Sequence, residues 1–470
     1  MAYDILIVNG QVVTATETLR ADVAIVGDKV VEVAPNLRRE GVGTLLDAAG
    51  NYVLPGGVDV HTHIDMPLTD TISSSDDFET GTRAAAFGGT TTVVDYAAQS
   101  RGQSLKEAIE LWKAKARGKA VIDYGFHCII TDLTDSVIHE TDELVAEGVS
   151  SFKVFMAYPG RLMLDDGAIF RLLQRSAVNG SLVCVHAENG GAIDVLVKQA
   201  VAAGNTEPKY HALTRPTIAE AEATGRAIAL AEMADASVYI AHVSCQRALD
   251  QIEQGRMRGL PVMGETCPQY LFLSLENFDV PAWEGAKYVL TPPLREKWNQ
   301  AKLWDGLASG ALQVVSTDHC PFNFRGQKDF AGNNFTRIPN GGPGIENRLS
   351  LIFTGGVLSG RFSVNRFVDL ASTTPARIFG MYPRKGTIAA GSDADLVIFN
   401  PHRQYTITAN SHHMRVDYSL YEGLSVTGVP EVVLSRGRII VRSGAFEGVA
   451  GSGEFLSRSP STALRQTTHG

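Results

Sequence analysis

The stretch Gly56-Gly57-Val58-Asp59-Val60-His61-Thr62-His63 decides the fold, because it reads as a buried strand that ends in two histidines. On an extended strand, the side chains of residues i and i+2 lie on the same side, so His61 and His63 direct both imidazole rings toward one point. Two imidazole rings that converge in this way are typical ligands of a divalent metal ion. The stretch therefore predicts a strand that carries part of a metal site.

Further apolar runs follow this strand, and most of them are followed by a helical pattern. Runs rich in valine, isoleucine and threonine are typical of strands, and their alternation with helices indicates a parallel sheet with right-handed crossovers. The predicted strands are 58–63, 90–96, 122–130, 151–156, 182–186, 237–242, 261–265 and 312–317. The predicted helices are 79–87, 105–117, 137–147, 168–179, 219–235, 247–258 and 302–309. This count and spacing predict an α/β fold, a (β/α)8 barrel of the TIM type.

The two ends of the chain carry short β-type runs in place of this alternation. The N-terminal runs are separated by turn formers such as Asn9-Gly10 and Gly27-Asp28. A similar pattern of short β-type runs occurs between residues 394 and 441. Because the termini of large domains often lie close together, we expect both ends to form one flanking β-sandwich domain. The predicted domains are thus a β-sandwich from 1–54 and 385–450, a barrel from 55–384, and a flexible C-terminal tail from 451–470.

The composition argues against several classes of protein. With 470 residues, 44% hydrophobic and 20% charged, the chain is typical of globular proteins with a large core. A net charge of −9 argues against nucleic acid or an anionic membrane as a partner. The five cysteines are scattered without a CxxC spacing, so neither a disulfide framework nor a thiolate zinc site is expected. Without a signal-peptide pattern or a membrane-spanning apolar run, we expect a cytoplasmic protein.

Polar residues stand at the C-terminal ends of the predicted strands, where a barrel of this type carries its chemistry. Besides the histidine pair, they are Lys153, His186, His242 and Asp318. Each of them alone has an ordinary interpretation: a hydrogen-bonded structural histidine, a lysine paired with a carboxylate, or an aspartate that caps a helix. Their joint occurrence at one face of one barrel favours a metal centre.

The number of these residues suggests two metal ions. His61, His63 and Asp318 would serve one ion, and His186 and His242 would serve the other. Two cations close together need an anionic bridge, and an ammonium group on Lys153 would have the wrong charge. A buried lysine can lose its proton and react with CO₂, and the resulting carbamate is an anionic ligand with two oxygens. A hydroxide shared by the two ions would then be a nucleophile near neutral pH.

A series of motifs matches a known family, both in their residues and in their order along the chain. The motifs are GGVDVHTH (56–63), SSFKVFMAY (150–158), VHAEN (185–189), AHVS (241–244), TPPLR (291–295), TDHCPF (317–322) and IPNGGPGIE (338–346). Over residues 4–450 the chain resembles the cyclic amidohydrolases, within them the dihydropyrimidinase/D-hydantoinase branch of the amidohydrolase superfamily. The resemblance implies a barrel with a flanking β-sandwich, a homotetramer, and two zinc ions per subunit bridged by carboxylated Lys153 and hydroxide.

The implied reaction is hydrolytic ring opening of small cyclic amides and imides, namely 5-substituted hydantoins and 5,6-dihydropyrimidines, to N-carbamoyl amino acids. Tyr158 would stabilise the developing oxyanion, and Thr291 and Asn340 would hold the imide through backbone groups. Asp318 would be both a metal ligand and the proton shuttle. Without the motifs, Tyr158 fits an interfacial aromatic residue and Asn340 fits a turn. The residues implied for an apolar lid over the ring substituent are Leu68, Phe155 and Leu162.

Three other functions fit the residues less well. An allantoinase shares the fold and the metals, but that branch lacks the tyrosine after FMA, so Tyr158 argues against it. A non-catalytic scaffold related to the dihydropyrimidinases would have lost metal ligands, whereas every ligand position is filled here. A mononuclear deaminase is disfavoured by Lys153. The motifs leave the natural substrate open between dihydropyrimidines and hydantoins.

Overall fold

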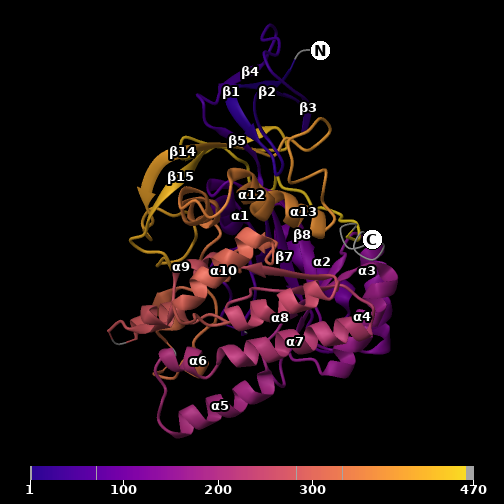
Figure 1. Ribbon diagram of the computed structural model, residues 1–470, viewed down its shortest axis with the longest axis vertical. Helices are drawn as coiled ribbons and strands as arrows, with labels where there is room; N and C mark the ends of the chain where they lie inside the picture. The colour runs from indigo at the N-terminus through magenta and orange to yellow at the C-terminus, as the bar shows by residue number, and fades with distance from the viewer. Residues whose placement is uncertain (1–2, 70, 282, 331, 462–470) are drawn as a thin grey trace.

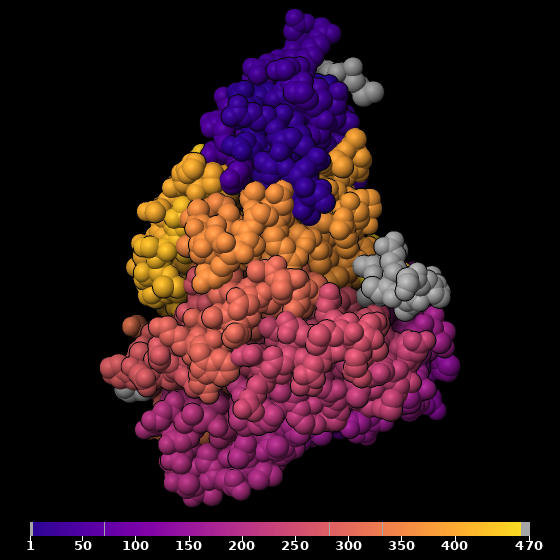
Figure 2. Space-filling model, in the orientation of Figure 1, coloured from indigo at the N-terminus to yellow at the C-terminus, as the bar shows by residue number. Residues whose placement is uncertain are grey.

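The computed structural model describes residues 3–69, 71–281, 283–330 and 332–461 of the chain. Two sheets organise these residues: a parallel sheet with the strand order of a barrel, and a mostly antiparallel sheet built from both chain ends (Figure 1). The second sheet lies at one end of an elongated molecule, and helices of the barrel lie at the other end (Figure 2). Among the described residues, no helix is long and apolar enough to cross a membrane.

The barrel contains eight parallel strands, which confirms the predicted fold class. They are β6 (Gly57–Thr62), β7 (Thr90–Ala98), β8 (Asp123–Ile129), β9 (Ser151–Phe155), β10 (Leu182–His186), β11 (Val238–Ile240), β12 (Val262–Thr266) and β13 (Val314–Val315). An isolated parallel bridge between Thr62 and His319 joins the two edges of this sheet. The strand β11 ends before His242 and β13 ends before Asp318, because both of these residues have left-handed backbone conformations, with φ of 39° and 52°.

The predicted helices all form, and their sequences explain where they begin. In α2, for example, Ser104 and Glu107 make a capping box, and Leu105, Ala108, Ile109 and Trp112 form the buried face. The predicted helices correspond to α1 (Phe78–Phe87), α2 (Leu105–Ala116), α3 (Asp135–Ala146), α4 (Asp166–Asn179), α7 (Thr217–Met233), α8 (Gln246–Met257) and α10 (Trp298–Ser309). Additional α-helices are α5 (Gly190–Ala202), α6 (Lys209–Leu213), α9 (Pro268–Phe272), α11 (Arg348–Ile352), α12 (Val364–Val368) and α13 (Thr374–Ile378). Short helical turns are η1 (Leu275–Phe278), η2 (Glu284–Tyr288), η3 (Phe324–Lys328), η4 (Phe335–Arg337), η5 (Phe353–Leu358) and η6 (Asp369–Thr373).

The sheet of the chain ends has nine strands, and the two ends meet where β5 pairs antiparallel with β14. Its strands are β1 (Ile5–Val13), β2 (Thr18–Val26), β3 (Lys29–Ala34), β4 (Thr44–Asp47), β5 (Tyr52–Pro55), β14 (Leu396–Thr406), β15 (Ser425–Ser435), β16 (Arg438–Arg442) and β17 (Ala445–Phe446). Gly56 alone separates β5 from β6, the first barrel strand. A Cβ atom at Gly56 would lie 2.0 Å from Thr91 Oγ1, so only glycine fits between the two sheets.

The C-terminal segment differs from the flexible tail predicted for 451–470. Phe455 forms a bridge with Tyr124 of β8, and the side chains of Leu456 and Arg458 are buried. The guanidinium group of Arg458 donates to Ser151 Oγ (3.0 Å) at the N-terminal end of β9. Because these side chains contact residues of the barrel strands β8 and β9, the segment is packed as far as Ser461. Residues 462–470 lie outside the described part of the chain.

Candidate metal centre and active site

The histidine pair at the end of β6 faces Asp318, which follows β13. His61 Nε2 lies 3.3 Å and His63 Nε2 lies 3.2 Å from Asp318 Oδ1. Ligand atoms of the three residues all lie within 4.8 Å of one another, so one metal ion can contact all of them. Burial alone would raise the pKa of Asp318, but His61 and His63 hold this pKa below its ordinary value.

A second pair of imidazole rings adjoins this group. His186 Nδ1 and His242 Nε2 are 2.9 Å apart, and both side chains are buried. The ring of His242 lies 5.2 Å from the ring of His61, measured between centroids. The two predicted ligand groups are therefore neighbours in one site, as a pair of metal ions requires.

Lys153 lies in β9 between these groups, and its side chain is 1% exposed. Among the described residues, its Nζ atom has no hydrogen-bond partner, and the same holds for His63 Nδ1 and His242 Nδ1. Burial lowers the pKa of Lys153, which favours the uncharged amine. Because a buried polar atom without a partner is costly, the unpartnered Nζ of Lys153, between the two histidine pairs, fits a group that is bound there.

One cavity, with a volume of about 400 Å³, opens above these residues. All of the residues singled out in the sequence line it: His61, His63, Leu68, Lys153, Phe155, Tyr158, Leu162, His186, His242, Thr291, Asp318 and Asn340. Sequence reasoning missed other lining residues, namely Met66, Ile72, Ile338, Arg161 and Arg337. Three of these are apolar and extend the predicted lid side of the cavity. Met66 and Ile72 lie in a loop without a recognisable motif, and Ile338 begins the motif at 338–346, where only Asn340 was assigned a role.

Tyr158 begins a tight turn at the rim of the cavity. Its φ of 66° is left-handed, a conformation that non-glycine residues adopt rarely and often at functional sites. Its carbonyl oxygen accepts from the backbone N–H groups of Arg161 and Leu162, both at 3.1 Å, which holds the loop that carries Leu162. Desolvation raises the pKa of Tyr158, so its hydroxyl group keeps its proton and can donate a hydrogen bond into the cavity.

Comparison with known proteins places this site in a family. A profile of the Amidohydrolase family matches residues 52–440. The chain belongs to this family. It is 51% identical to the D-hydantoinase of Geobacillus stearothermophilus over 460 residues, which are 98% of this chain and 97% of that protein. The resemblance inferred from the motifs is thereby confirmed.

Solved structures agree with this assignment. The amidohydrolase is similar to the D-hydantoinase of Bacillus sp. AR9, with a TM-score of 0.95, 54% identity, and coverage of 97% of this chain and 99% of that chain. The dihydropyrimidinase of Brevibacillus agri NCHU1002 also gives a TM-score of 0.95 and 54% identity, with coverage of 97% and 98%.

A buried carboxylate behind the ligands orients them in this amidohydrolase. Glu265, in β12, pairs through Oε1 with His61 Nδ1, so Nε2 of His61 faces the cavity. Oε1 also accepts from the backbone N–H of His242 (3.1 Å), and Oε2 accepts from Tyr239 Oη (2.8 Å) and Ser316 Oγ (2.6 Å). Such partners fix the tautomer and the orientation of metal-binding histidines. No sequence signal marks Glu265, because a single acidic residue inside a predicted strand carries no motif.

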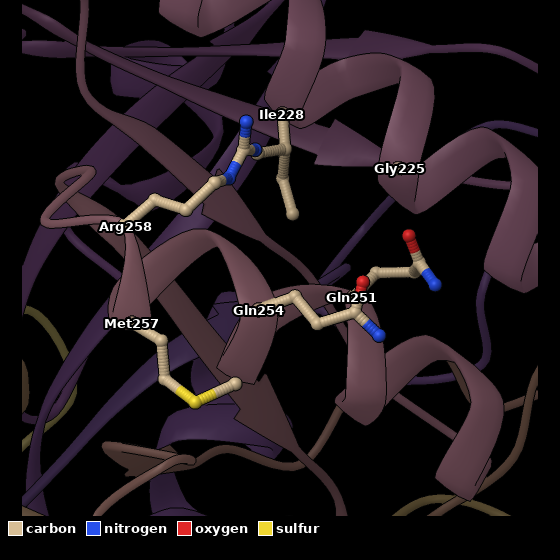
Figure 3. A pocket seen from close by; sticks show the side chains of 6 residues that line it. All are labelled: Gly225, Ile228, Gln251, Gln254, Met257 and Arg258. Atoms are coloured by element: carbon tan, nitrogen blue, oxygen red, sulfur yellow. The ribbon is translucent and has the colours of Figure 1, made fainter.

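Another cavity of the amidohydrolase lies away from this site. It has a volume of about 360 Å³ and lies between α7 and α8 (Figure 3). The described residues that line it are Gly225, Ile228, Gln251, Gln254, Met257 and Arg258. None of these side chains is a carboxylate or an imidazole, so this cavity is not a candidate metal site.

Lys328 connects two segments of the active-site wall. Its side chain is fully buried, and Nζ donates to the carbonyl oxygens of Val289 and Pro339, both at 2.9 Å. These carbonyl groups lie just before Thr291 and Asn340 in the chain. Lys328 therefore holds together the two segments predicted to bind the imide. Burial lowers the pKa of Lys328 to about 7.

Lys328→Met is expected to change how stability depends on pH. An unfolded chain binds the lysine proton up to a pKa of about 10.4, so between about pH 7 and pH 10 the unfolded state holds more protons than the folded state. The contribution of Lys328 to stability therefore rises with pH in this window. We expect the free energy of unfolding of the wild type, relative to Lys328→Met, to increase by about 2 kcal/mol from pH 7 to pH 9. Urea denaturation measures this difference, with the exposed Lys198→Met as a control that should show no such trend. A constant difference for Lys328→Met would contradict the prediction.

Proposed function

We propose that this amidohydrolase opens the rings of 5-substituted hydantoins and 5,6-dihydropyrimidines by hydrolysis, giving N-carbamoyl amino acids. The observation that carries the proposal is the single cavity that contains both ligand groups, Lys153 and an apolar side formed by Leu68, Phe155 and Leu162. A metal centre beside an apolar wall suits a cyclic amide with an apolar substituent. The names of the relatives, D-hydantoinase and dihydropyrimidinase, support the same reaction.

We infer that the site holds two zinc ions. His61, His63 and Asp318 would hold one of them, His186 and His242 the other, and carboxylated Lys153 would bridge both. The convergence of the histidine nitrogens and Asp318 Oδ1, together with the unpartnered Nζ of Lys153, supports this assignment. When bound, such a metal pair would lower the pKa of a water molecule toward neutral pH, so that hydroxide would be available to attack a carbonyl carbon.

The residues around the metal centre would bind the ring and move the proton. The carboxylate of Asp318 takes the proton from the attacking water and delivers it to the leaving ring nitrogen. Tyr158 Oη donates a hydrogen bond to the carbonyl oxygen as negative charge develops on it. Backbone groups of Thr291 and Asn340 hold the imide in place. This division of roles leaves the apolar lid to select the substituent.

A turnover assay with three substrates tests the proposal. After loading with zinc, the protein should hydrolyse dihydrouracil and a 5-aryl hydantoin, and it should not hydrolyse allantoin. Metal analysis of the same sample should find about two zinc ions per chain. Turnover of allantoin alone would indicate an allantoinase, and a chain without zinc and without turnover would indicate a scaffold protein.

We also propose that the protein is a cytoplasmic homotetramer. Exposed apolar residues on the outer helices α5–α7 support assembly, since Val195, Leu213 and Ile218 are each more than half exposed. Light scattering should then give a mass near four chains of 50.5 kDa. A single chain in solution would contradict the proposal.

Polar substitution of the lid is expected to affect bulky substrates most. Leu68 and Leu162 both line the cavity and are partly buried. Burial of an alkyl or aryl substituent is worth roughly 1–3 kcal/mol, or about 10- to 200-fold in specificity. Leu68→Ser or Leu162→Ser should therefore lower kcat/KM for a 5-aryl hydantoin by up to that factor and leave dihydrouracil less affected. Leu111→Ser, on the outer face of α2, is the control and should change neither value. Equal losses for both substrates would show that the lid does not select the substituent.

A further inference from the structure

The backbone of Asp318 is strained and depends on its neighbours. Its φ of 52° lies in the left-handed region, which residues other than glycine adopt at some cost in energy, so contacts with neighbouring residues help to hold it. Its carboxylate must nevertheless stay close to His61 and His63, 3.3 and 3.2 Å from their Nε2 atoms. The residues that enforce this conformation therefore control the geometry of the metal centre.

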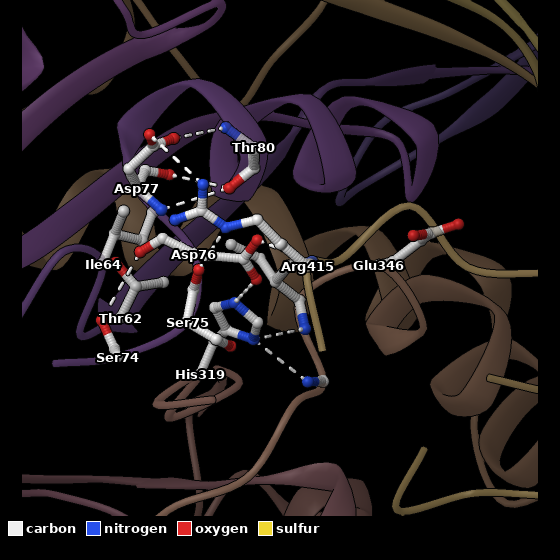
Figure 4. Close-up of polar contacts among 12 residues, drawn as sticks. Thr62, Ile64, Ser74, Ser75, Asp76, Asp77, Thr80, His319, Glu346 and Arg415 are labelled. Atoms are coloured by element: carbon white, nitrogen blue, oxygen red, sulfur yellow. Dashed lines mark hydrogen bonds and ion pairs between the residues drawn. The ribbon is translucent and has the colours of Figure 1, made fainter. Parts of the chain in front are cut away.

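His319, the next residue, is fully buried, and both its backbone and its ring make hydrogen bonds (Figure 4). Its backbone carbonyl accepts from the N–H of His63 (2.8 Å), and its backbone N–H donates to Thr317 Oγ1 (3.2 Å). Its ring Nδ1 accepts from the backbone N–H of Gly344 (3.2 Å). Since that N–H group can only donate, the ring carries its proton on Nε2.

Nε2 of His319 points at Asp76, which is also fully buried, and the distance to Oδ2 is 3.1 Å. The other carboxylate oxygen, Oδ1, accepts from the backbone N–H of Arg415 (2.8 Å). Both oxygens of Asp76 thus face N–H donors from segments far away in the chain (Figure 4). An amide side chain in this position could satisfy only one of these donors.

Asp76 also ends the loop that forms the lid side of the cavity. Its carbonyl oxygen accepts from the N–H of Asp65 (2.8 Å), and within the loop Ser74 N–H donates to Met66 O (2.9 Å). The loop closed in this way carries the lining residues Leu68 and Ile72. The pair of Asp76 and His319 consequently touches two parts of the active site, the lid loop and the segment of Asp318.

We propose that Asp76 and His319 form a positioning pair that holds Asp318 at the metal centre and fixes the lid loop to it. This inference rests on the proposed metal site, and only its catalytic part rests on the proposed reaction. Asp76 and His319 are positioning residues, since neither lines the cavity. Loss of their hydrogen bond would release the strained backbone of Asp318 and weaken the metal site.

Asp76→Ala tests the pair, with Asp77→Ala as a matched control. Asp77 is the neighbouring residue, and it caps α1 by accepting from the N–H groups of Glu79 and Thr80, without contact to His319. Both variants should lose stability, but only Asp76→Ala should lose zinc affinity, by about 10- to 100-fold in competition with a chromophoric chelator. Its kcat should fall by a similar factor, and its KM should rise more for a 5-aryl hydantoin than for dihydrouracil.

Asp76→Asn extends the test to a variant with the native shape. Because its amide can satisfy only one of the two donors, its zinc affinity should fall between those of the wild type and Asp76→Ala. If both Asp76 variants kept wild-type zinc affinity and kcat while unfolding as easily as Asp77→Ala, the pair would be merely structural and the proposal would be overturned. A wild type that binds zinc but turns over no cyclic amide would refute the proposed function, while the comparison of zinc affinities would still decide this inference.

Discussion

Lys153→Ala is expected to remove the metal pair and abolish turnover. Lys153 is buried, its Nζ has no hydrogen-bond partner among the described residues, and alanine would remove the proposed carbamate bridge. Without a bridge, two cations a few ångströms apart repel each other through a medium of low dielectric constant. The zinc content should therefore fall from about two ions to below about one per chain. Metal analysis and a turnover assay on the same sample measure both effects.

A short carboxylic acid added to Lys153→Ala should restore part of the activity, because its two oxygens can take the place of the carbamate. Lys198→Ala, at an exposed position on α5, is the control and should keep its zinc and its turnover. Circular dichroism should show that the Lys153→Ala barrel is folded. An unmodified Lys153 beside a fully occupied metal pair in a crystal structure would contradict the prediction.

The barrel could be predicted because its signals are local. His61 and His63 are two residues apart on one strand, and each barrel strand carries its own apolar run between helical patterns. Once the strands were counted, the rule that barrel chemistry lies at their C-terminal ends selected His186, His242 and Asp318. The structure brings these residues to one cavity with Lys153.

The residues that position the site could not be predicted from the sequence, since they act through contacts between segments that are distant in the chain. Glu265 lies 204 residues from its partner His61, and Asp76 lies 243 residues from His319. Single acidic residues and histidines of this kind have no spacing that distinguishes them from surface residues or caps. Lys328 is similar, because only the fold reveals that both of its acceptors are backbone carbonyl groups.

The ends of strands β11 and β13 show another limit of sequence patterns. The apolar runs predicted strands that continue to His242 and Thr317, yet the observed strands stop earlier. The left-handed conformations of His242 and Asp318 turn the chain there and aim both side chains into the cavity. Aspartate and histidine adopt a positive φ more readily than most residues, but the sequence does not show which of them do so, because tertiary contacts decide it.

Asp318→Asn is expected to lower turnover by about two to four orders of magnitude, the usual range for loss of general acid–base catalysis. Asparagine keeps a side-chain oxygen at the position that now lies 3.3 Å from His61 Nε2, so one ligand atom for the metal remains. It cannot accept the proton from water or pass it to the leaving nitrogen. The defect should therefore appear in kcat, whereas the zinc content should change less than in Lys153→Ala.

The comparison of kcat with zinc content separates the two roles of Asp318. Asp305→Asn, at an exposed position on α10, provides a control for the change of charge and should leave both values unchanged. If Asp318→Asn lost its zinc together with its turnover, the carboxylate would act mainly as a ligand. If the variant instead kept near-normal turnover, another group would have to move the proton, and Tyr158 is the remaining titratable side chain predicted to contact the reacting carbonyl. The expected result, with zinc retained and kcat strongly reduced, assigns the proton transfer to Asp318.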